Sequence, residues 1–247
     1  MSNRENYIEL LKNCIINTIY EDKPSDPWSD KNKYDQNKRE KGLDWPSMAH
    51  SMIGLKRMEN LQFCCENVIK NKIPGDFIEC GVWRGGATIF MRGILKAYDD
   101  NSRQVWLADS FEGLPKPNEK EFPADEGDKH HEFEPLAISL EEVQENFRKY
   151  NLLDKNVNFL KGWFKDTLPN ADINSISVLR ADGDMYESTI QILENLYSKV
   201  TVGGYIIIDD YHAIEACSKA VTEYRESQNI KDEIIEIDGV GVYWQKS

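Results

Sequence analysis

Apolar and polar residues change their spacing several times along the chain, and each change predicts a different element. Residues 77–93, FIECGVWRGGATIFMRG, begin with a short apolar run, turn through glycines and continue with apolar residues at helical spacing. Four more apolar runs of strand type alternate with helical segments, at residues 104–108, 156–161, 176–181 and 205–208. Strands that alternate with helices predict an α/β fold, with a mostly parallel sheet and helices on both faces.

Helical spacing extends the pattern on both sides of these strands. Helices are predicted at residues 4–20, 51–71, 139–150, 186–200 and 214–227. Ser139 and Glu142 stand where a capping box would begin the third of these helices. Two last apolar runs, at residues 232–237 and 241–245, are joined by Asp238-Gly239-Val240, and Asp-Gly suits a tight hairpin.

The predicted organisation is therefore a seven-stranded sheet with a C-terminal β-hairpin and an N-terminal helical extension. We assign residues 1–72 to N-terminal helices with a lid loop, and residues 73–247 to one compact α/β domain.

Two long segments lack periodicity, at residues 21–50 and 119–135, and we expect both to be loops that order over an acceptor. In the first, Trp28 and Trp45 either pin the loop to the core or form a wall of the acceptor pocket. In the second, His130 and His131 are adjacent in sequence and point apart. They suit solvated loop residues better than a metal-binding pair.

The glycine turn after the first strand predicts a ligand site. The segment from Glu79 to Gly85 reads E-x-G-x-x-x-G rather than G-x-G-x-x-G, and Trp83 stands where a dinucleotide site needs its second glycine. This disfavours a pyrophosphate and favours a ligand without one, such as S-adenosylmethionine (SAM). Gly81 suits a backbone conformation closed to other residues, and the next helix offers free N–H groups to the ligand. A βα turn with purely structural glycines is the alternative.

Acidic residues stand at the ends of the other strands as well. Asp109 ends the second strand, where such an acid grips ribose hydroxyls; its alternative is a helix cap. Asp182 and the pair Asp209-Asp210 follow the fourth and fifth strands. Carboxylates crowded at one sheet edge repel one another, and a divalent cation such as Mg²⁺ relieves that repulsion. A single Asp at a strand end would more simply cap a helix.

The amino-acid composition argues against several other classes of protein. The net charge of −13 argues against nucleic-acid binding and against docking to anionic membranes. No run of about 18 apolar residues predicts a membrane span, and the N-terminus has no apolar signal region. The five cysteines are odd in number and form no C-x-x-C pair, so we expect neither a disulfide framework nor a zinc knuckle. A cytoplasmic location follows as an expectation.

Five blocks, ECGVWRGG, ADSFEGLP, GWFKDTLP, LRADGDMYEST and GGYIIIDDYH, together resemble the macrocin O-methyltransferase (TylF) family from about residue 47 to the C-terminus. The resemblance implies a Rossmann-like, class I SAM-dependent methyltransferase fold. It implies a Mg²⁺ site made by Asp182, Asp209 and Asp210. It implies SAM contacts at Ser51, Met52, Glu79, Gly81, Val82, Gly85, Asp109, Ser110, Phe111, Gly162, Trp163, Phe164 and Asp182.

The acceptor's proton has several candidate destinations. Catechol-type methyltransferases keep a lysine base at the position of Met185, so proton removal falls here to Asp182, a metal-bound water or His212. Asp182 is preferred because one carboxylate oxygen can hold the metal while the other takes the proton.

The expected function is methylation of a hydroxyl, with a second hydroxyl beside it, on a glycosylated secondary metabolite. A homo-oligomer, dimer or tetramer, is also expected. The alternatives are a phenolic, cell-surface or nucleotide-linked sugar acceptor, a non-catalytic SAM-binding protein, and a nicotinamide oxidoreductase. Trp83 argues against the last of these, and the three acids argue against a non-catalytic protein.

Overall fold

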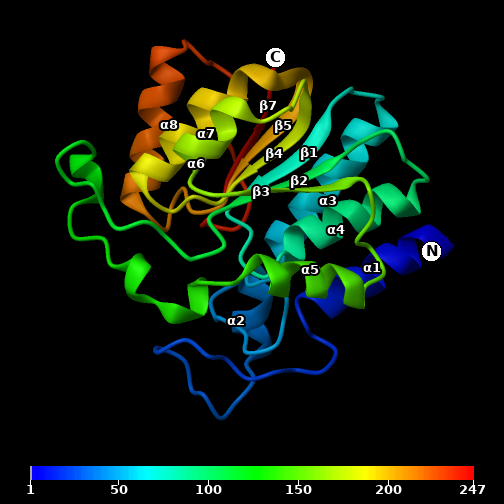
Figure 1. The fold of residues 1–247 in the computed structure, drawn as a ribbon. Coiled ribbons are helices and arrows are strands. Elements are labelled where there is room, and N and C mark those ends of the chain that lie inside the picture. The colour runs from blue at the N-terminus through cyan, green and yellow to red at the C-terminus, as the bar shows by residue number, and fades with distance from the viewer. Residues whose placement is uncertain (1) are drawn as a thin grey trace.

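A computed structural model describes residues 2–247 and has one seven-stranded sheet with the strand order β3-β2-β1-β4-β5-β7-β6 (Figure 1). Strands β1 to β5 run parallel, and β7 is antiparallel to both β5 and β6, so the predicted parallel sheet and closing hairpin are confirmed. The strands are β1 (Asp76–Cys80), β2 (Val105–Asp109), β3 (Val157–Lys161), β4 (Ile176–Ala181), β5 (Val200–Ile208), β6 (Ile235–Glu236) and β7 (Val242–Gln245).

Helices cover both faces of the sheet, as Figure 1 shows. They are α1 (Asn3–Ile15), α2 (Gln36–Lys41), α3 (Gly54–Lys70), α4 (Gly86–Ala97), α5 (Leu140–Lys149), α6 (Phe164–Thr167), α7 (Tyr186–Leu196) and α8 (Glu215–Ser227). Helices α1, α3, α4 and α5 pack on one face, where Phe77 and Val178 point. Helices α7 and α8 pack on the other, against Ile78 and Leu179. Neighbouring strand residues thus supply both cores because successive side chains point to opposite faces.

The N-terminal helices are part of the main core. Ile8 of α1 and Met58 of α3 lie in the same buried cluster as Phe77 and Val178 of the sheet. The boundary predicted at residue 72 therefore lies between segments that share one hydrophobic core. Among the described residues, no helix combines the length and the apolar composition that a membrane span requires.

Strand β5 differs from its prediction. It begins at Val200 instead of residue 205, and α7 ends at Leu196 instead of residue 200, with a 3₁₀ turn at Tyr197–Lys199 between them. The glycine pair 203–204 is therefore inside the strand. Gly203 has a φ of +85°, and the β4–β5 register slips between Ile176 and Val178. The glycines thus allow a bulge within the strand, where the sequence predicted a turn before it.

The two aperiodic segments contain short helical pieces. The first contains α2, which is capped by Asp35 and ended by Gly42 in a left-handed conformation. The second contains 3₁₀ turns at Pro123–Asp125, His130–Glu132 and Glu134–Leu136. The predicted N-terminal helix ends early, at Ile15. Ser139 caps α5 through the N–H of Glu142, as predicted.

Candidate active site

A cavity of about 520 Å³ lies at the carboxyl ends of the parallel strands. Its walls come from the ends of β1, β2, β4 and β5, from the start of α4 and from both aperiodic segments. Every residue predicted to contact SAM lines it except Gly85 and Phe111, and Asp209 and Asp210 line it as well. The structure therefore brings most of the predicted site together at one sheet edge, where ligands of open α/β sheets bind.

Gly85 and Phe111 lie outside this lining because both are used for packing. A Cβ on Gly85 would stand 2.8 Å from Cγ1 of Val143 on α5, so this glycine permits close helix packing. Phe111 is 4% exposed, and its ring packs against Phe159 of β3.

The left-handed backbone predicted at Gly81 is present, with a φ of +84°. A Cβ there would stand 1.8 Å from the carbonyl oxygen of Asp182, so the close approach is between the ends of β1 and β4 rather than between Gly81 and a ligand. One helix N–H that we expected to be free is also used, because Gly86 N–H donates to the carbonyl of His50 at 2.9 Å.

A buried arginine organises the acids at the centre of the sheet edge. Arg180 of β4 is 1% exposed, and its Nη1 donates to Oε1 of Glu79 at 2.6 Å and to Oδ2 of Asp182 at 2.7 Å. Its Nη2 donates to Asp209, whose other oxygen accepts from Arg57 of α3. Guanidinium groups therefore compensate the negative charges of Glu79 and Asp209. The sequence signal for this role was a charged residue inside the buried run ISVLRA, and we missed it.

One oxygen of this network has no partner. Oε2 of Glu79 is buried and makes no hydrogen bond within the described residues, while the carboxyl group lines the cavity. Burial raises the pKa of Glu79 to about 8, although Arg180 acts to lower it. An orphaned buried acceptor is costly, so this oxygen is suited to accept a hydrogen bond from a bound ligand.

Three other carboxylates form a cluster beside it. Oxygens of Asp182, Asp184 and Asp210 lie within 4.8 Å of one another. Burial, with the neighbouring acids, raises the pKa of Asp182 and raises that of Asp210 well above its usual value. For the same reasons the pKa of Asp184 rises to about 7. The cluster includes Asp184, which the sequence did not predict as a ligand, whereas each oxygen of Asp209 accepts a hydrogen bond from an arginine.

The cluster suits a hard divalent cation. All its donors are carboxylate oxygens, the ligands that Mg²⁺, Ca²⁺ and Mn²⁺ prefer, and no sulfur or imidazole belongs to it. The raised pKa values show that the three groups cannot all ionise easily without a compensating charge.

Asp109 already has partners in the chain. Its Oδ2 accepts from the N–H of Val82 and its Oδ1 from the N–H of Phe111, both at 2.7 Å. It thus ties the turn after β1 to the turn after β2. Each carboxylate oxygen has more than one lone pair and Asp109 lines the cavity, so the turn-tying role and ribose binding are compatible.

The two aperiodic segments meet over the cavity. Trp28, Leu43 and Trp45 of the first line it, and the rings of Trp28 and Trp45 make an edge contact at 4.8 Å between centroids. Trp45 also contacts the ring of Phe133 in the second segment at 5.4 Å. The tryptophans therefore form part of the cavity wall, one of the two roles that the sequence left open.

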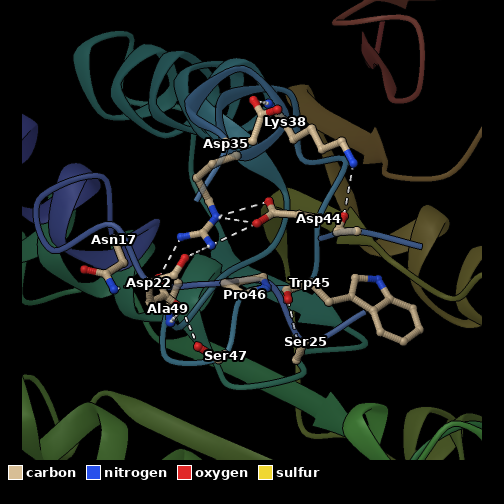
Figure 2. A network of polar contacts seen from close by, with 12 residues as sticks. Asn17, Asp22, Ser25, Asp35, Lys38, Asp44, Trp45, Pro46, Ser47 and Ala49 are labelled. Atoms are coloured by element: carbon tan, nitrogen blue, oxygen red, sulfur yellow. Dashed lines mark hydrogen bonds and ion pairs between the residues drawn. The ribbon is translucent and has the colours of Figure 1, made fainter. Parts of the chain in front are cut away.

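A buried polar network holds the first segment in place. Arg39 of α2 is 1% exposed and donates to the carboxylates of Asp22 and Asp44 and to the carbonyl of Ile16. Figure 2 shows Asp22 and Asp44 on opposite sides of the guanidinium group, and Asp22 reaching Ser47 and Ala49. The charges are paired and hydrogen-bonded, as buried charges must be.

The structure places His212 and His130 differently from the sequence prediction. His212 is exposed, lies against the ring of Tyr211 at 5.0 Å and lines a separate surface hollow, outside the main cavity. His130, which we read as a solvated loop residue, lines the main cavity. Its Nδ1 lies 2.5 Å from Oδ2 of Asp128. The D-x-H spacing was the available signal, since it allows the acid to reach the ring.

Comparisons with known proteins agree with this architecture. A family model described as Macrocin-O-methyltransferase (TylF) matches residues 4–246. The demethyldecarbamoylnovobiocin O-methyltransferase of Streptomyces niveus is 51% identical over 244 residues, 98% of this chain and 93% of that protein. The mycinamicin III 3''-O-methyltransferase of Micromonospora griseorubida is 48% identical over 247 residues, 98% of this chain and 97% of that protein.

Solved structures confirm the predicted class I methyltransferase fold. The structure of the O-methyltransferase NovP matches with a TM-score of 0.94 and 50% identity, covering 99% of this chain and 100% of that one. The calicheamicin methyltransferase CalS11, at 15% identity, shares the fold with a TM-score of 0.64, covering 99% of this chain and 93% of that one. The chain therefore belongs to the macrocin-O-methyltransferase (TylF) family and is an O-methyltransferase.

Proposed function

We propose that the enzyme transfers the methyl group of SAM to a sugar hydroxyl of a glycosylated secondary metabolite, and that it requires Mg²⁺. The observation that carries this proposal is one cavity that joins two features: the unpartnered buried oxygen of Glu79 and the cluster of Asp182, Asp184 and Asp210. The first suits a donor-rich cosubstrate, and the second suits a divalent cation.

In this proposal the β1 and β2 ends hold SAM. Oε2 of Glu79 accepts a hydrogen bond from an amine or hydroxyl of SAM, and Asp109 uses its spare lone pairs on the ribose. Trp163 and Phe164 lie after β3, line the same cavity and are only half-buried, so their rings are available to the adenine.

The acid cluster holds the metal in this proposal. Asp182, Asp184 and Asp210 supply the oxygens, while Asp209, predicted as a ligand, positions the cluster through Arg180 and Arg57. A bound divalent ion would lower the pKa of a hydroxyl group that it contacts and fix its orientation. Holding acceptor and donor together contributes up to ~7–11 kcal/mol in favourable cases.

The acceptor side is formed by the two lid segments. Trp28 is 55% exposed although it lines the cavity, so its ring offers apolar surface at the entrance. The names of the two relatives give demethyldecarbamoylnovobiocin and mycinamicin III as their acceptors. A chelating metal favours an acceptor with two neighbouring oxygens, such as a sugar diol.

An acceptor panel tests the proposal. The purified enzyme is incubated with methyl-labelled SAM, Mg²⁺ and one compound at a time: demethyldecarbamoylnovobiocin, mycinamicin III, a catechol or a nucleotide-linked sugar. Mass spectrometry then detects the methylated product. We expect label on a glycoside hydroxyl and none on the catechol. If label were transferred to the catechol or the nucleotide-linked sugar alone, that compound class would replace glycosides as the proposed acceptor.

A thermal-shift screen separates the remaining classes. We expect SAM to raise the melting temperature and NADH to leave it unchanged, because Trp83 disfavours a pyrophosphate. Stabilisation by NADH alone would favour an oxidoreductase.

A further inference from the structure

Trp83 occupies a strained position in the turn between β1 and α4, and its side chain reaches the second aperiodic segment. Its backbone has a φ of +45°, a left-handed conformation that costs free energy for a bulky residue. Its indole N–H donates to the carbonyl of Pro135 at 2.9 Å, and the residue also lines the cavity. A glycine would adopt this conformation without strain but could not make the contact. The contact with the second segment is therefore what a tryptophan supplies at this position.

Arg84, the next residue, reaches the first aperiodic segment. Its Nη1 donates to the carbonyl of Pro46 at 3.0 Å and to that of Ala49 at 2.9 Å. Its guanidinium carbon lies 4.2 Å from the centroid of the Trp83 ring, so the two side chains stack. Within residues 2–247 the Arg84 side chain donates only to these two carbonyls. The charge therefore strengthens two hydrogen bonds to the first segment.

The two anchor points lie beside the place where the segments meet. Pro46 directly follows Trp45, and Pro135 is two residues after Phe133. The rings of Trp45 and Phe133 are in contact at 5.4 Å between centroids. Loss of one anchor would free one side of this contact and leave the other side held. The two anchors can therefore be tested one at a time.

The turn that carries both anchors also forms the cosubstrate side of the cavity. Gly81, Val82 and Trp83 line the cavity, as does Glu79, whose Oε2 has no partner within the described residues. The N–H of Val82 donates to the carboxylate of Asp109 at 2.7 Å. A ligand bound between these groups would restrict the turn from which both side chains extend.

We propose that Trp83 and Arg84 are positioning residues, which hold both aperiodic segments on the SAM-binding turn so that the acceptor binds the SAM-loaded enzyme more tightly than the free enzyme. This inference rests on the proposed function, which places SAM at this turn. The physical reason is conformational entropy. SAM restricts the turn, the turn restricts both segments through the three hydrogen bonds, and the acceptor then has less of the chain to order. By linkage, the acceptor tightens SAM binding by the same factor.

Amide hydrogen exchange tests the proposal without an acceptor, by comparing the protein with and without S-adenosylhomocysteine, the demethylated product of SAM. In the wild type we expect this ligand to slow exchange in residues 44–50 and 133–138 by about 5-fold or more. Trp83→Phe keeps an aromatic ring but removes the indole N–H, and should lose the slowing in residues 133–138 alone. Arg84→Met should lose it in residues 44–50 alone. Slowing that persists in both variants, or no slowing in a wild type that binds the ligand, would overturn the proposal.

Calorimetry measures the consequence for acceptor affinity. The acceptor is whichever of demethyldecarbamoylnovobiocin and mycinamicin III the wild type methylates, at saturating Mg²⁺. We expect S-adenosylhomocysteine to lower the acceptor dissociation constant of the wild type about 5-fold or more, and this factor to fall towards 1 in Trp83→Phe and Arg84→Met. A purely structural role would weaken acceptor binding equally with and without the ligand. An unchanged factor in both variants would therefore contradict the proposal.

Two matched controls lose the same groups away from the cavity. Trp106→Phe removes an indole N–H that donates to Asp76 at 2.9 Å, and Arg148→Met removes an exposed arginine of α5. Trp106 and Arg148 lie outside the cavity lining, so both variants should keep the wild-type exchange pattern and coupling factor. Equal losses in the controls would overturn the proposal. If S-adenosylhomocysteine does not bind the wild type, the proposed function fails and this inference falls with it. If it binds but neither glycoside is methylated, only the proposed acceptor class fails, and the exchange pattern decides the role of the two residues.

Discussion

Glu79 has an unpartnered buried oxygen and lines the cavity, and its substitution gives a sharp test. Glu79→Gln keeps the size of the side chain but replaces one acceptor oxygen with an N–H₂ donor. A hydrogen bond in which one partner is charged, such as one from the ammonium group of SAM, is worth about 1.5–3 kcal/mol, so we expect the SAM dissociation constant to rise about 10-fold or more. Titration calorimetry measures it. Asp154→Asn is the matched control, since Asp154 pairs with Arg92 away from the cavity. Equal affinity in Glu79→Gln and wild type would remove Glu79 from the SAM site.

The raised pKa values at the site predict an unusual pH dependence of stability. Burial raises the pKa of Asp184 to about 7 and that of Glu79 to about 8, so the folded state holds these protons more tightly than the unfolded chain does. Their contribution to stability is complete below about pH 4, the unfolded pKa, and is lost as the pH rises towards 8. The melting temperature of the metal-free protein should therefore fall as the pH rises from 5 to 8.

Asp184→Asn should make this decline shallower, because one of the two titrating groups is gone. Mg²⁺ should stabilise the wild type more at pH 8 than at pH 5, since the cation displaces protons from the cluster. Differential scanning calorimetry at the two pH values decides the point. A melting temperature that rises over this range without metal would contradict the buried, protonated cluster.

At the residue scale, the sequence predicted which acidic residues stand at strand ends, but not which groups compensate their negative charges. An apolar run of strand type followed by Asp can be recognised in the sequence, so Asp109 and Asp182 were predicted as site residues. Whether the partner of an acid is a metal or an arginine depends on which side chains the sheet brings together. Arg57 is more than 150 positions from Asp209, and no local pattern links the two.

At the scale of elements, the α2 segment depends on one buried arginine. Replacing one member of a buried ion pair leaves its partners uncompensated and typically costs about 3–5 kcal/mol. We expect Arg39→Met to lower the free energy of unfolding by about this amount in urea denaturation. It should also speed proteolysis within residues 22–49. Lys38→Met is the control, because among residues 2–247 the ammonium group of Lys38 reaches only the hydroxyl of Ser29. Similar losses in both variants would show that the network does not stabilise the segment.

The regular elements were predictable because their periodicity is local, and the irregular ones were not. Helices α3, α4 and α8 carry clear apolar stripes and lie where the sequence placed them, within a few residues. Helix α2 is short and polar, so its only signals are the cap at Asp35 and the stop at Gly42. Asp125 holds the 3₁₀ turns around His130 against α7, because its carboxylate accepts the N–H of Tyr186. The two segments are about 60 residues apart in the sequence.

At the scale of the whole molecule, the N-terminal helices complete the core of the sheet. Ile8, Met58 and Leu61 are each at most 1% exposed within the main cluster. A chain that begins at residue 73 would expose this surface, and we expect it to be insoluble or to unfold without cooperativity. Calorimetry and near-ultraviolet circular dichroism measure this. A truncated chain with a sharp, native-like transition would show that residues 73–247 form an independent domain, as the sequence suggested.

The central claim is that the acids at the strand ends form a metal-dependent methyl-transfer site. The most direct measurement is transfer of labelled methyl from SAM to the glycoside acceptor in exhaustively chelated enzyme, before and after Mg²⁺ is returned. The wild type should lose transfer on chelation and recover it with Mg²⁺. Asp182→Asn should stay inactive at any Mg²⁺ concentration, and Asp154→Asn should behave like the wild type. Full turnover in the chelated wild-type enzyme, or recovery of Asp182→Asn with Mg²⁺, would contradict the account.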